Sequence, residues 1–235
     1  CRKTMTGELR MQESHRETIG SADLPSRSLA DCVGVEAIDA VLGAEAERIL
    51  IQDPSIPVGV PDPGALLPGS FNPLHQGHVG LARAASGILG LPVHFELSVI
   101  NVEKPSLDRA EILNRLRTFS PEHAVWLTRQ PRFMEKARVF PGWVFVVGAD
   151  TAARIIDGRF YPGGLQDMSQ ALAVIRERKN RFLVAGRRMG DRLMLLEDLS
   201  IPEEYRDLFQ EIPANVFQMD VSSTAIRQSR DHRSG

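Results

Sequence analysis

Short apolar runs alternate with helical patterns from residue 64 onward, and this alternation constrains the fold more than any other feature of the chain. The apolar runs predict strands at 65–70, 93–100, 124–128, 143–147, 182–185 and 216–219. Apolar residues at helical spacing predict helices at 76–90, 107–119, 149–157, 165–179, 202–210 and 222–230. Strands that alternate with helices form parallel sheets, so the sequence predicts a doubly wound α/β fold. Ligands of such folds bind beyond the carboxyl ends of the strands, where the strand order reverses.

The first 60 residues have a different character. Residues 1–24 carry charges of both signs and few large apolar side chains, which predicts a mobile leader. One helix is expected within 24–50, with Asp31 or Gly34 near its start. The segment 52–63 contains four prolines and can continue neither a helix nor a central strand. The sequence therefore predicts an N-terminal extension over 1–60 and a domain over 64–235.

Charge and composition exclude several classes of protein. The formal net charge is −2, so no overall positive field exists to hold a nucleic-acid backbone. The two cysteines, Cys1 and Cys32, give no disulfide framework and no metal-binding pair, and no apolar run approaches the ~18 residues of a membrane span. We expect a cytoplasmic protein without nucleic-acid or membrane partners. An organellar location is left open because the chain starts at Cys rather than Met, and so is a homo-oligomer.

The strongest chemical signal follows the first predicted strand. Residues 69–78 read Gly-Ser-Phe-Asn-Pro-Leu-His-Gln-Gly-His, which places His75 and His78 three residues apart on one face of a starting helix. Unpaired N–H groups at a helix N-terminus favour an anion, two imidazoles add donors, and Gly77 allows a close approach. The run predicts a phosphate site. The alternative is a loop whose histidines satisfy backbone groups.

A second signal lies near the C-terminus, where residues 220–227 read Asp-Val-Ser-Ser-Thr-Ala-Ile-Arg. The hydroxyl groups of Ser222, Ser223 and Thr224 at a helix start offer donors to a phosphate, and Arg227 follows in the first turn. An ordinary N-cap explains Ser222 alone. The segment therefore predicts a second phosphate-binding element about 150 residues after the first.

A third signal is a strand that runs into a glycine turn at residues 146–151, Val-Val-Gly-Ala-Asp-Thr. A carboxylate that accepts two hydroxyl protons is a common way to hold ribose, which makes Asp150 after Gly148 a candidate. The alternative is an aspartate that only caps a helix.

Together these segments resemble the nucleotidyltransferase superfamily, which includes the class I aminoacyl-tRNA synthetases and has a Rossmann-like fold of the HUP type. Residues 69–78 match its G-x-F-x-P-x-H-x-G-H motif, and 222–227 match the S-S-T-x-I-R motif of its adenylyl-transferring branch. Cytidylyltransferases that make phospholipid precursors usually carry R-T-x-G-I-S-T there. The strand before Gly-Ala-Asp is similar to that of the nicotinamide and nicotinate mononucleotide adenylyltransferases.

The resemblance implies a role for each matching residue. His75 and His78 are expected to bind the nucleotide phosphates, with His78 nearest the α-phosphate, while Lys104 and Arg227 neutralise the acceptor and leaving phosphates respectively. Nucleotide binding is expected from Gly69, Ser70, Phe71, Gly77, Gly148, Asp150, Ser222, Ser223 and Thr224. Weaker candidates for substrate binding are Thr128, Tyr161 or Phe160, and Arg187 with Arg188 as its alternative. Trp126 and Trp143 are interpreted as core residues.

The chain also departs from the pyridine-nucleotide enzymes. It lacks their E-W-x-x-T and S-Y-T-x-D-T stretches, which help to build the nicotinyl pocket, and residues 128–133 read Thr-Arg-Gln-Pro-Arg-Phe instead. It is similar as well to divergent cytidylyltransferase-like domains, which some plants and microbes fuse to a competence-damage-type amidohydrolase domain. That likeness rests on Asn-x-x-Lys-Pro at 101–105 and Phe-Val-Val-Gly-Ala-Asp-Thr at 145–151. The acceptor is therefore less constrained than the adenylyl donor.

The implied activity is in-line transfer of an adenylyl group from ATP to a phosphorylated acceptor, nicotinamide or nicotinate mononucleotide, with release of pyrophosphate. Mg²⁺ is expected to bridge the triphosphate with few or no protein ligands, since Mg²⁺ in such sites keeps water and substrate oxygens. One alternative is a catalytically silent nucleotide-binding or regulatory module. Another is a transferase that uses CTP or a different phosphorylated acceptor.

Overall fold

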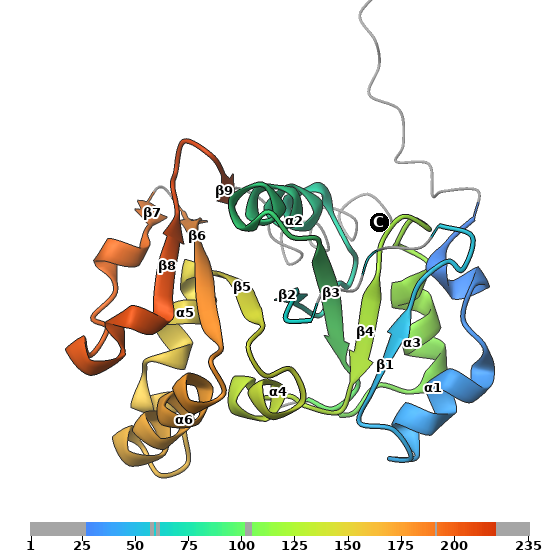
Figure 1. Ribbon diagram of the computed structural model, residues 1–235, viewed down its shortest axis with the longest axis horizontal. Coiled ribbons are helices and arrows are strands. Elements are labelled where there is room, and N and C mark those ends of the chain that lie inside the picture. Colours follow the sequence, from blue (N-terminus) through green and yellow to red (C-terminus); the bar gives the residue numbers. More distant parts are fainter. Residues whose placement is uncertain (1–26, 57–58, 60–61, 102–104, 191, 220–235) are drawn as a thin grey trace, which may run out of the picture.

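The computed structural model of the chain describes residues 27–56, 59, 62–101, 105–190 and 192–219, which form one mixed sheet with helices on both sides (Figure 1). The strands are β1 (Arg48–Ile51), β2 (Ala65–Pro68), β3 (Val93–Ser98), β4 (Val125–Thr128), β5 (Val144–Gly148), β6 (Arg181–Met189), β7 (Arg192–Met194), β8 (Phe209–Ile212) and β9 (Gln218–Met219). The α-helices are α1 (Val35–Leu42), α2 (Gln76–Leu89), α3 (Arg109–Leu116), α4 (Phe133–Val139), α5 (Ala149–Ile155) and α6 (Leu165–Glu177). Short 3-10 helices lie at Leu29–Asp31, Gly158–Phe160, Leu196–Asp198 and Glu203–Leu208. None of the helices in these ranges has both the length and the apolar composition that crossing a membrane requires.

The parallel strands lie in the order β4-β3-β2-β5-β6-β8. The chain starts at β2, moves outward through β3 to β4, and then returns to the other side of β2 to add β5, β6 and β8. The predicted Rossmann-like, doubly wound α/β fold is therefore confirmed. The strand order reverses between β2 and β5, and a crevice at the carboxyl ends of these two strands is where such folds bind ligands.

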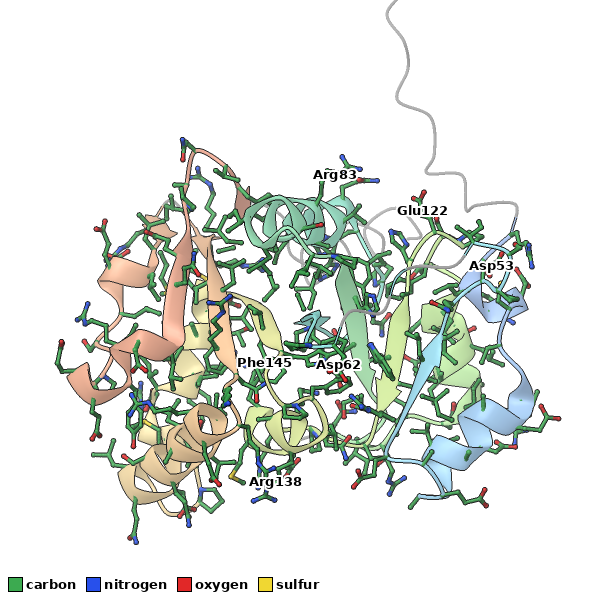
Figure 2. The ribbon with its side chains drawn as sticks, viewed as in Figure 1. Asp53, Asp62, Arg83, Glu122, Arg138 and Phe145 are labelled. Atoms are coloured by element: carbon green, nitrogen blue, oxygen red, sulfur yellow. The ribbon has the colours of Figure 1, made fainter. Side chains whose placement is uncertain are left out.

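Alternate side chains of the central strands enter two separate hydrophobic cores. Leu67 and Val146 pack in one cluster with α1, α2 and α3, whereas Leu66 and Phe145 pack in the other with α4, α5 and α6. Figure 2 shows Phe145 among packed side chains and Arg138 at the rim. Because both faces of the sheet are buried, β2 and β5 read as nearly continuous apolar runs, whereas β3 carries the buried polar residues His94 and Glu96.

The N-terminal part of the described chain packs onto the same sheet. The helix expected within 24–50 is α1, which begins after Gly34 and buries Ile38 and Val41 completely in the first cluster. The sequence does not indicate β1, which pairs antiparallel with β4 and forms one edge of the sheet. The described residues before the proline-rich segment thus supply a helix and an edge strand to the same sheet as the predicted domain.

The C-terminal elements differ from the expectation. The helix predicted at 202–210 is a 3-10 helix that ends at Leu208, and Phe209 then starts β8. Phe209 and Ile212 are both buried beside β6, so pairing with the sheet overrides the helical pattern. The strand predicted at 216–219 is reduced to the two residues of β9. The helix predicted at 222–230 lies outside the described residues.

Candidate active site

The loop that follows β2 is held in place by the ring of Phe71. This residue is fully buried, has a φ of 42°, and packs edge-on against Phe95, Phe119 and His78. Gly69 lies under the same ring, because a Cβ on this glycine would come within 2.7 Å of two ring carbons. The loop thus depends on a glycine and a buried aromatic ring to carry the chain from β2 to α2.

Helix α3 holds the same loop from the other side. Arg115 Nη1 donates to the Ser70 carbonyl at 2.8 Å, and the Leu74 N–H donates to Thr118 Oγ1 at 3.3 Å. The guanidinium of Arg115 is itself held by Glu111 at 2.8 Å. The side chain of Ser70 stays exposed. The loop between β2 and α2 is therefore fixed by contacts along its whole length.

The first turn of α2 orients the two candidate histidines. The backbone N–H of His75 donates to His78 Nδ1 at 3.3 Å, and the two rings stack with centroids 3.7 Å apart, with Gly77 half-buried between them in the chain. Because Nδ1 accepts this bond, the proton of neutral His78 lies on Nε2. Burial, followed by the charges of His75 and Arg187, lowers the pKa of His78 to about 3. His78 is thus a neutral imidazole whose free donor is Nε2–H.

The ring of His75 has unmet hydrogen-bonding capacity. Both of its nitrogens are buried and have no hydrogen-bond partner within the described part of the chain. Burial, and then the charge of Arg187, lowers the pKa of His75 as well. Arg187 lies on β6 and is half-buried, whereas the neighbouring Arg188 is exposed. The sheet therefore brings Arg187 close enough to influence both imidazoles, and buried polar atoms without partners call for an explanation such as a ligand.

The turn after β5 carries the candidate ribose-binding carboxylate. Gly148 ends β5 opposite Ala185 of β6, and α5 starts at the next residue. A Cβ on Gly148 would lie 2.6 Å from Asp150 Oδ1, so the carboxylate occupies the space that a larger residue would fill. Asp150 forms no hydrogen bond or ion pair with the residues described here. Because β5 is adjacent to β2, this acceptor, at the start of α5, lies close in the sheet order to the loop that carries the two histidines (residues 69–78, the histidine loop).

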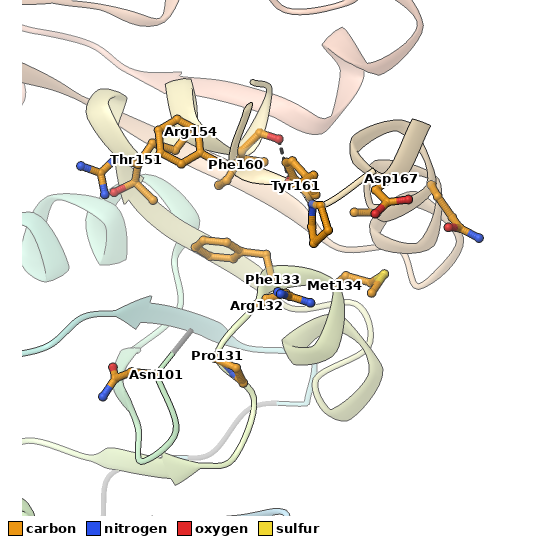
Figure 3. Close-up of a pocket in the computed structure, with 14 residues that line it drawn as sticks. Asn101, Pro131, Arg132, Phe133, Met134, Thr151, Arg154, Phe160, Tyr161 and Asp167 are labelled. Carbon is orange, nitrogen blue, oxygen red and sulfur yellow. Dashed lines mark hydrogen bonds between the residues drawn. The ribbon is translucent and has the colours of Figure 1, made fainter. Parts of the chain in front are cut away.

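A pocket of about 510 Å³ opens between α4, α5 and the start of α6. Figure 3 shows Arg154 and Phe160 on one wall and Arg132 and Phe133 on the opposite wall. The predicted Tyr161 lines the pocket, and its hydroxyl donates to the Ile155 carbonyl at 2.8 Å. The full lining is Asn101, Pro131, Arg132, Phe133, Met134, Thr151, Arg154, Ile155, Phe160, Tyr161, Pro162, Asp167, Gln170 and Ala171.

Thr128, another expected substrate contact, is not among the residues that line this pocket. It is completely buried at the end of β4, where its hydroxyl donates to Glu96. Glu96 also pairs with Lys136 Nζ at 2.6 Å, and Lys136 donates to the Gln130 carbonyl at 2.6 Å. Both charged side chains of this pair are nearly inaccessible, at 1% and 4% exposure. The network fixes α4 against β3 and β4 directly behind one wall of the pocket.

Five predicted residues lie outside the described part of the chain. They are Lys104, Ser222, Ser223, Thr224 and Arg227. The last described residue, Met219, pairs with Arg187 on β6, and Phe217 packs beside Gly80 of α2. The chain therefore reaches the candidate site three residues before the first of the predicted hydroxyl groups.

Several residues of the site have no motif that would reveal them. Arg115 and Glu111 hold the loop through α3, and Lys136 acts through Glu96. For Arg154 the sequence gives one indirect signal. It lies one helical turn after Thr151, the last residue of the 146–151 stretch, and so shares its face of α5. The contacts of Arg115 with Ser70 and of Lys136 with Glu96 depend on which elements become neighbours, which a single segment cannot show.

The donor set of the site is suited to phosphate rather than to a bare metal ion. It consists of imidazoles and a guanidinium around the start of α2, and no group of three or more His, Cys, Asp or Glu residues in the described ranges is arranged to hold a metal. Mg²⁺ prefers oxygen ligands. Mg²⁺ at this site would accordingly belong to the nucleotide substrate, whose phosphate oxygens are its ligands.

Comparison with models of protein families gives a match over most of the chain. A family model described as Cytidylyltransferase-like matches residues 66–229, which is well over half of the chain. No curated protein matches the chain. The matched range begins within β2 and contains the histidine loop, the turn after β5 and every residue that lines the pocket.

Proposed function

Because the chain belongs to the cytidylyltransferase-like family of the nucleotidyltransferase superfamily, we propose that it transfers an adenylyl group from ATP to a phosphorylated acceptor. The acceptor we propose is nicotinamide or nicotinate mononucleotide, and the second product is pyrophosphate. One observation carries this proposal. The stacked pair His75 and His78 lies at the start of α2, beside Arg187, where the strand order reverses.

The triphosphate of the nucleotide is assigned to the start of α2. Helix α2 has 14 residues, so its first turn presents unpaired N–H groups and the positive end of a helix dipole. His78 adds a neutral Nε2–H donor, and Arg187 adds a positive charge. His75 adds two ring nitrogens that have no partner among the described residues. Ser222, Ser223, Thr224 and Arg227 are proposed to complete the site around the β- and γ-phosphates.

The nucleoside is assigned to the turn after β5. Asp150 keeps both carboxylate oxygens unbonded among the described residues, and Gly148 leaves room for them. A carboxylate in this position accepts hydrogen bonds from two ribose hydroxyls. The proposed acceptor is assigned to the neighbouring pocket, where Phe133, Phe160 and Tyr161 provide aromatic surface for a flat base.

The chemistry needs no protein nucleophile. A phosphate oxygen of the acceptor attacks the α-phosphorus of ATP in line, a new P–O bond forms, and the bond to the β-phosphate oxygen breaks to release pyrophosphate. Mg²⁺ enters bound to the triphosphate and screens its charge. The protein contributes position and charge stabilisation, with His78 proposed at the α-phosphate and Lys104 at the acceptor phosphate.

The test of this function follows pyrophosphate release by the purified chain with Mg²⁺ and either ATP or CTP. The acceptors are nicotinamide mononucleotide, nicotinate mononucleotide and other small phosphorylated compounds. We expect turnover with ATP and a pyridine mononucleotide. His78→Ala is expected to lower that turnover by about 100-fold, because a single charge-stabilising donor contributes about that much in other enzymes. Gln76→Ala, an exposed change in the same turn, is the matched control and should retain the activity.

Four results would contradict parts of the proposal. Nucleotide binding without pyrophosphate release, with every acceptor, identifies a silent binding module. Release with CTP in place of ATP corrects the donor, and release with another acceptor corrects the acceptor. Unchanged turnover in His78→Ala removes this residue from the mechanism.

A further inference from the structure

We propose that the pocket lined by Arg132 and Arg154 selects an acceptor whose ring carries a carboxylate over one whose ring carries a neutral carboxamide. The inference rests on the proposed function, because it assumes that the acceptor binds in this pocket. It is carried by two guanidinium groups on facing walls with aromatic rings between them (Figure 3).

The charges of the pocket are unbalanced. Arg132 and Arg154 form no ion pair within the part of the chain that the structure describes. Asp167 is the single carboxylate among the lining residues, and its Oδ2 accepts from the Gly163 N–H at 2.8 Å. The lining therefore carries two positive charges and one negative charge, and the negative group, Asp167, already accepts a hydrogen bond. A negatively charged ligand removes this imbalance.

The positive charge of Arg132 influences Tyr161, which also lines the pocket. Burial raises the pKa of the Tyr161 hydroxyl, and the positive charge of Arg132 acts in the opposite direction. On the other wall the guanidinium of Arg154 lies 5.5 Å from the centre of the Phe160 ring, and Phe160 is 52% exposed. An exposed aromatic ring beside a guanidinium that has no ion pair among the described residues provides both a stacking surface and a charge for a flat anionic group.

Hydrogen-bonding chemistry separates the two kinds of ring. A guanidinium only donates, and a carboxylate only accepts, so Arg132 and a ring carboxylate are complementary. A carboxamide carries no charge and has one acceptor oxygen beside an NH₂ group that donates, so it can accept from a guanidinium through its oxygen only. The pocket thus favours the acid, which brings two acceptor oxygens and a negative charge, over the amide.

Sheet order assigns the two arginines to different parts of the acceptor. Arg154 lies on α5, which follows β5, and β5 is adjacent to β2 and the histidine loop. Arg132 follows β4, which is separated from β2 by β3. The acceptor phosphate must reach the nucleotide at the histidine loop, so Arg154 faces the phosphate and Arg132 faces the ring carboxylate.

The experiment compares nicotinate mononucleotide with nicotinamide mononucleotide, which share phosphate, ribose and ring shape and differ in the ring substituent. Calorimetry gives Kd for each, and pyrophosphate release gives kcat/KM. We expect the acid to be favoured by about tenfold, the size of one charge-assisted contact at a partly exposed site. Arg132→Gln should bring the acid-to-amide ratio close to one, whereas Arg154→Gln should weaken both acceptors alike.

Arg159→Gln is the matched control, because it removes the same charge close to Phe160 but outside the pocket lining. Arg159 is 88% exposed and paired with Asp157. It should leave the ratio and the activity unchanged.

The outcomes distinguish this inference from the proposed function. A ratio near one in the parent protein, or a ratio that Arg132→Gln does not change, overturns the inference even when pyrophosphate is released with both acceptors. Tighter binding of the acid with no pyrophosphate from either acceptor supports the inference and contradicts the proposed function. Binding of neither mononucleotide overturns both.

Discussion

The two ring nitrogens of His75 are buried and have no hydrogen-bond partner among the described residues. This arrangement makes the folded protein less stable, and it leaves both nitrogens available to a ligand. Leaving a buried polar atom without a partner costs about 1–3 kcal/mol, and both ring nitrogens of His75 are in this position among the described residues. His75→Leu has nearly the same volume and no polar atoms. We expect its free energy of unfolding, measured by urea denaturation, to stay the same or rise by about 1 kcal/mol, while pyrophosphate release falls to background.

The same denaturation on Gln76→Ala provides the reference for a change in that turn outside the buried cluster. A loss of more than about 1 kcal/mol in His75→Leu would show that the ring stabilises the loop itself. In that case its nitrogens have partners in the folded chain, and the assignment of their hydrogen bonds to a ligand is wrong.

Residues that act within one short segment could be predicted from the sequence. The histidine pair, Gly148 and Asp150 each depend on a strand, a turn and a helix that are contiguous in the chain. Arg132 and Arg154 could not be predicted as a pair, because they line the same pocket only after β4 and β5 take their places in the sheet. Of two residues chosen by resemblance alone, Tyr161 lines the pocket and Thr128 points into the core.

At the scale of elements, a buried ion pair fixes α4 to the sheet. Lys136 and Glu96 lie 2.6 Å apart with almost no exposure to water. Removing one partner leaves the other as an unpaired buried charge, so we expect Lys136→Met to lower the free energy of unfolding by about 3–5 kcal/mol. Urea denaturation of this variant against the parent protein measures the loss.

The single variant Glu96→Gln and the double variant Lys136→Met with Glu96→Gln complete the thermodynamic cycle. The double variant is the informative one. It removes both charges and keeps an acceptor for the Thr128 hydroxyl, so most of the stability should return. An equal loss in the single and double variants would mean that α4 is held by apolar packing, and that the ion pair contributes nothing to its position.

Long elements with a strong period were predictable and short ones were not. α2 and α6 have 14 and 13 residues, and their apolar spacing gives both the type and the approximate ends. α4 has seven residues and β1 four, which is too short for a period to be distinguished from chance. β8 follows the polar segment Glu203–Leu208 without a turn residue, so its start is visible only in its pairing with β6.

At the scale of the whole molecule, buried histidines that stay neutral make the free energy of unfolding depend on pH. Burial lowers the pKa values of His75, His78, His94 and His123. His94 is completely buried, accepts from Trp126 Nε1 at 3.1 Å and lies 3.0 Å from the Gly59 carbonyl. Of the two tryptophans that the sequence predicts as core residues, Trp126 stacks with the ring of His94 and Trp143 packs edge-on against it. Because both tryptophans of the chain contact this ring, tryptophan fluorescence should respond to a change at His94.

The sign of the pH effect follows from these lowered pKa values. Unfolded histidines take up protons near pH 6.5, whereas the folded protein resists protonation until lower pH, so the unfolded state binds more protons below about pH 6.5. The free energy of unfolding should therefore be nearly constant from pH 8 to 7. It should then fall as the pH drops from 6.5 to 5, by up to about 1.4 kcal/mol per pH unit for each histidine.

His94→Gln isolates the contribution of one histidine to this pH dependence. The variant loses packing at every pH, which its free energy of unfolding at pH 8 measures separately. Its further loss between pH 7 and 5 should be smaller than that of the parent protein by about 1–2 kcal/mol, because one proton-binding group has been removed from the unfolded state. Urea denaturation followed by tryptophan fluorescence gives both numbers. Equal losses in the two proteins would show that His94 takes up its proton as readily when folded as when unfolded, and the hydrogen bond from Trp126 would then have to break at pH 5 without loss of the fold.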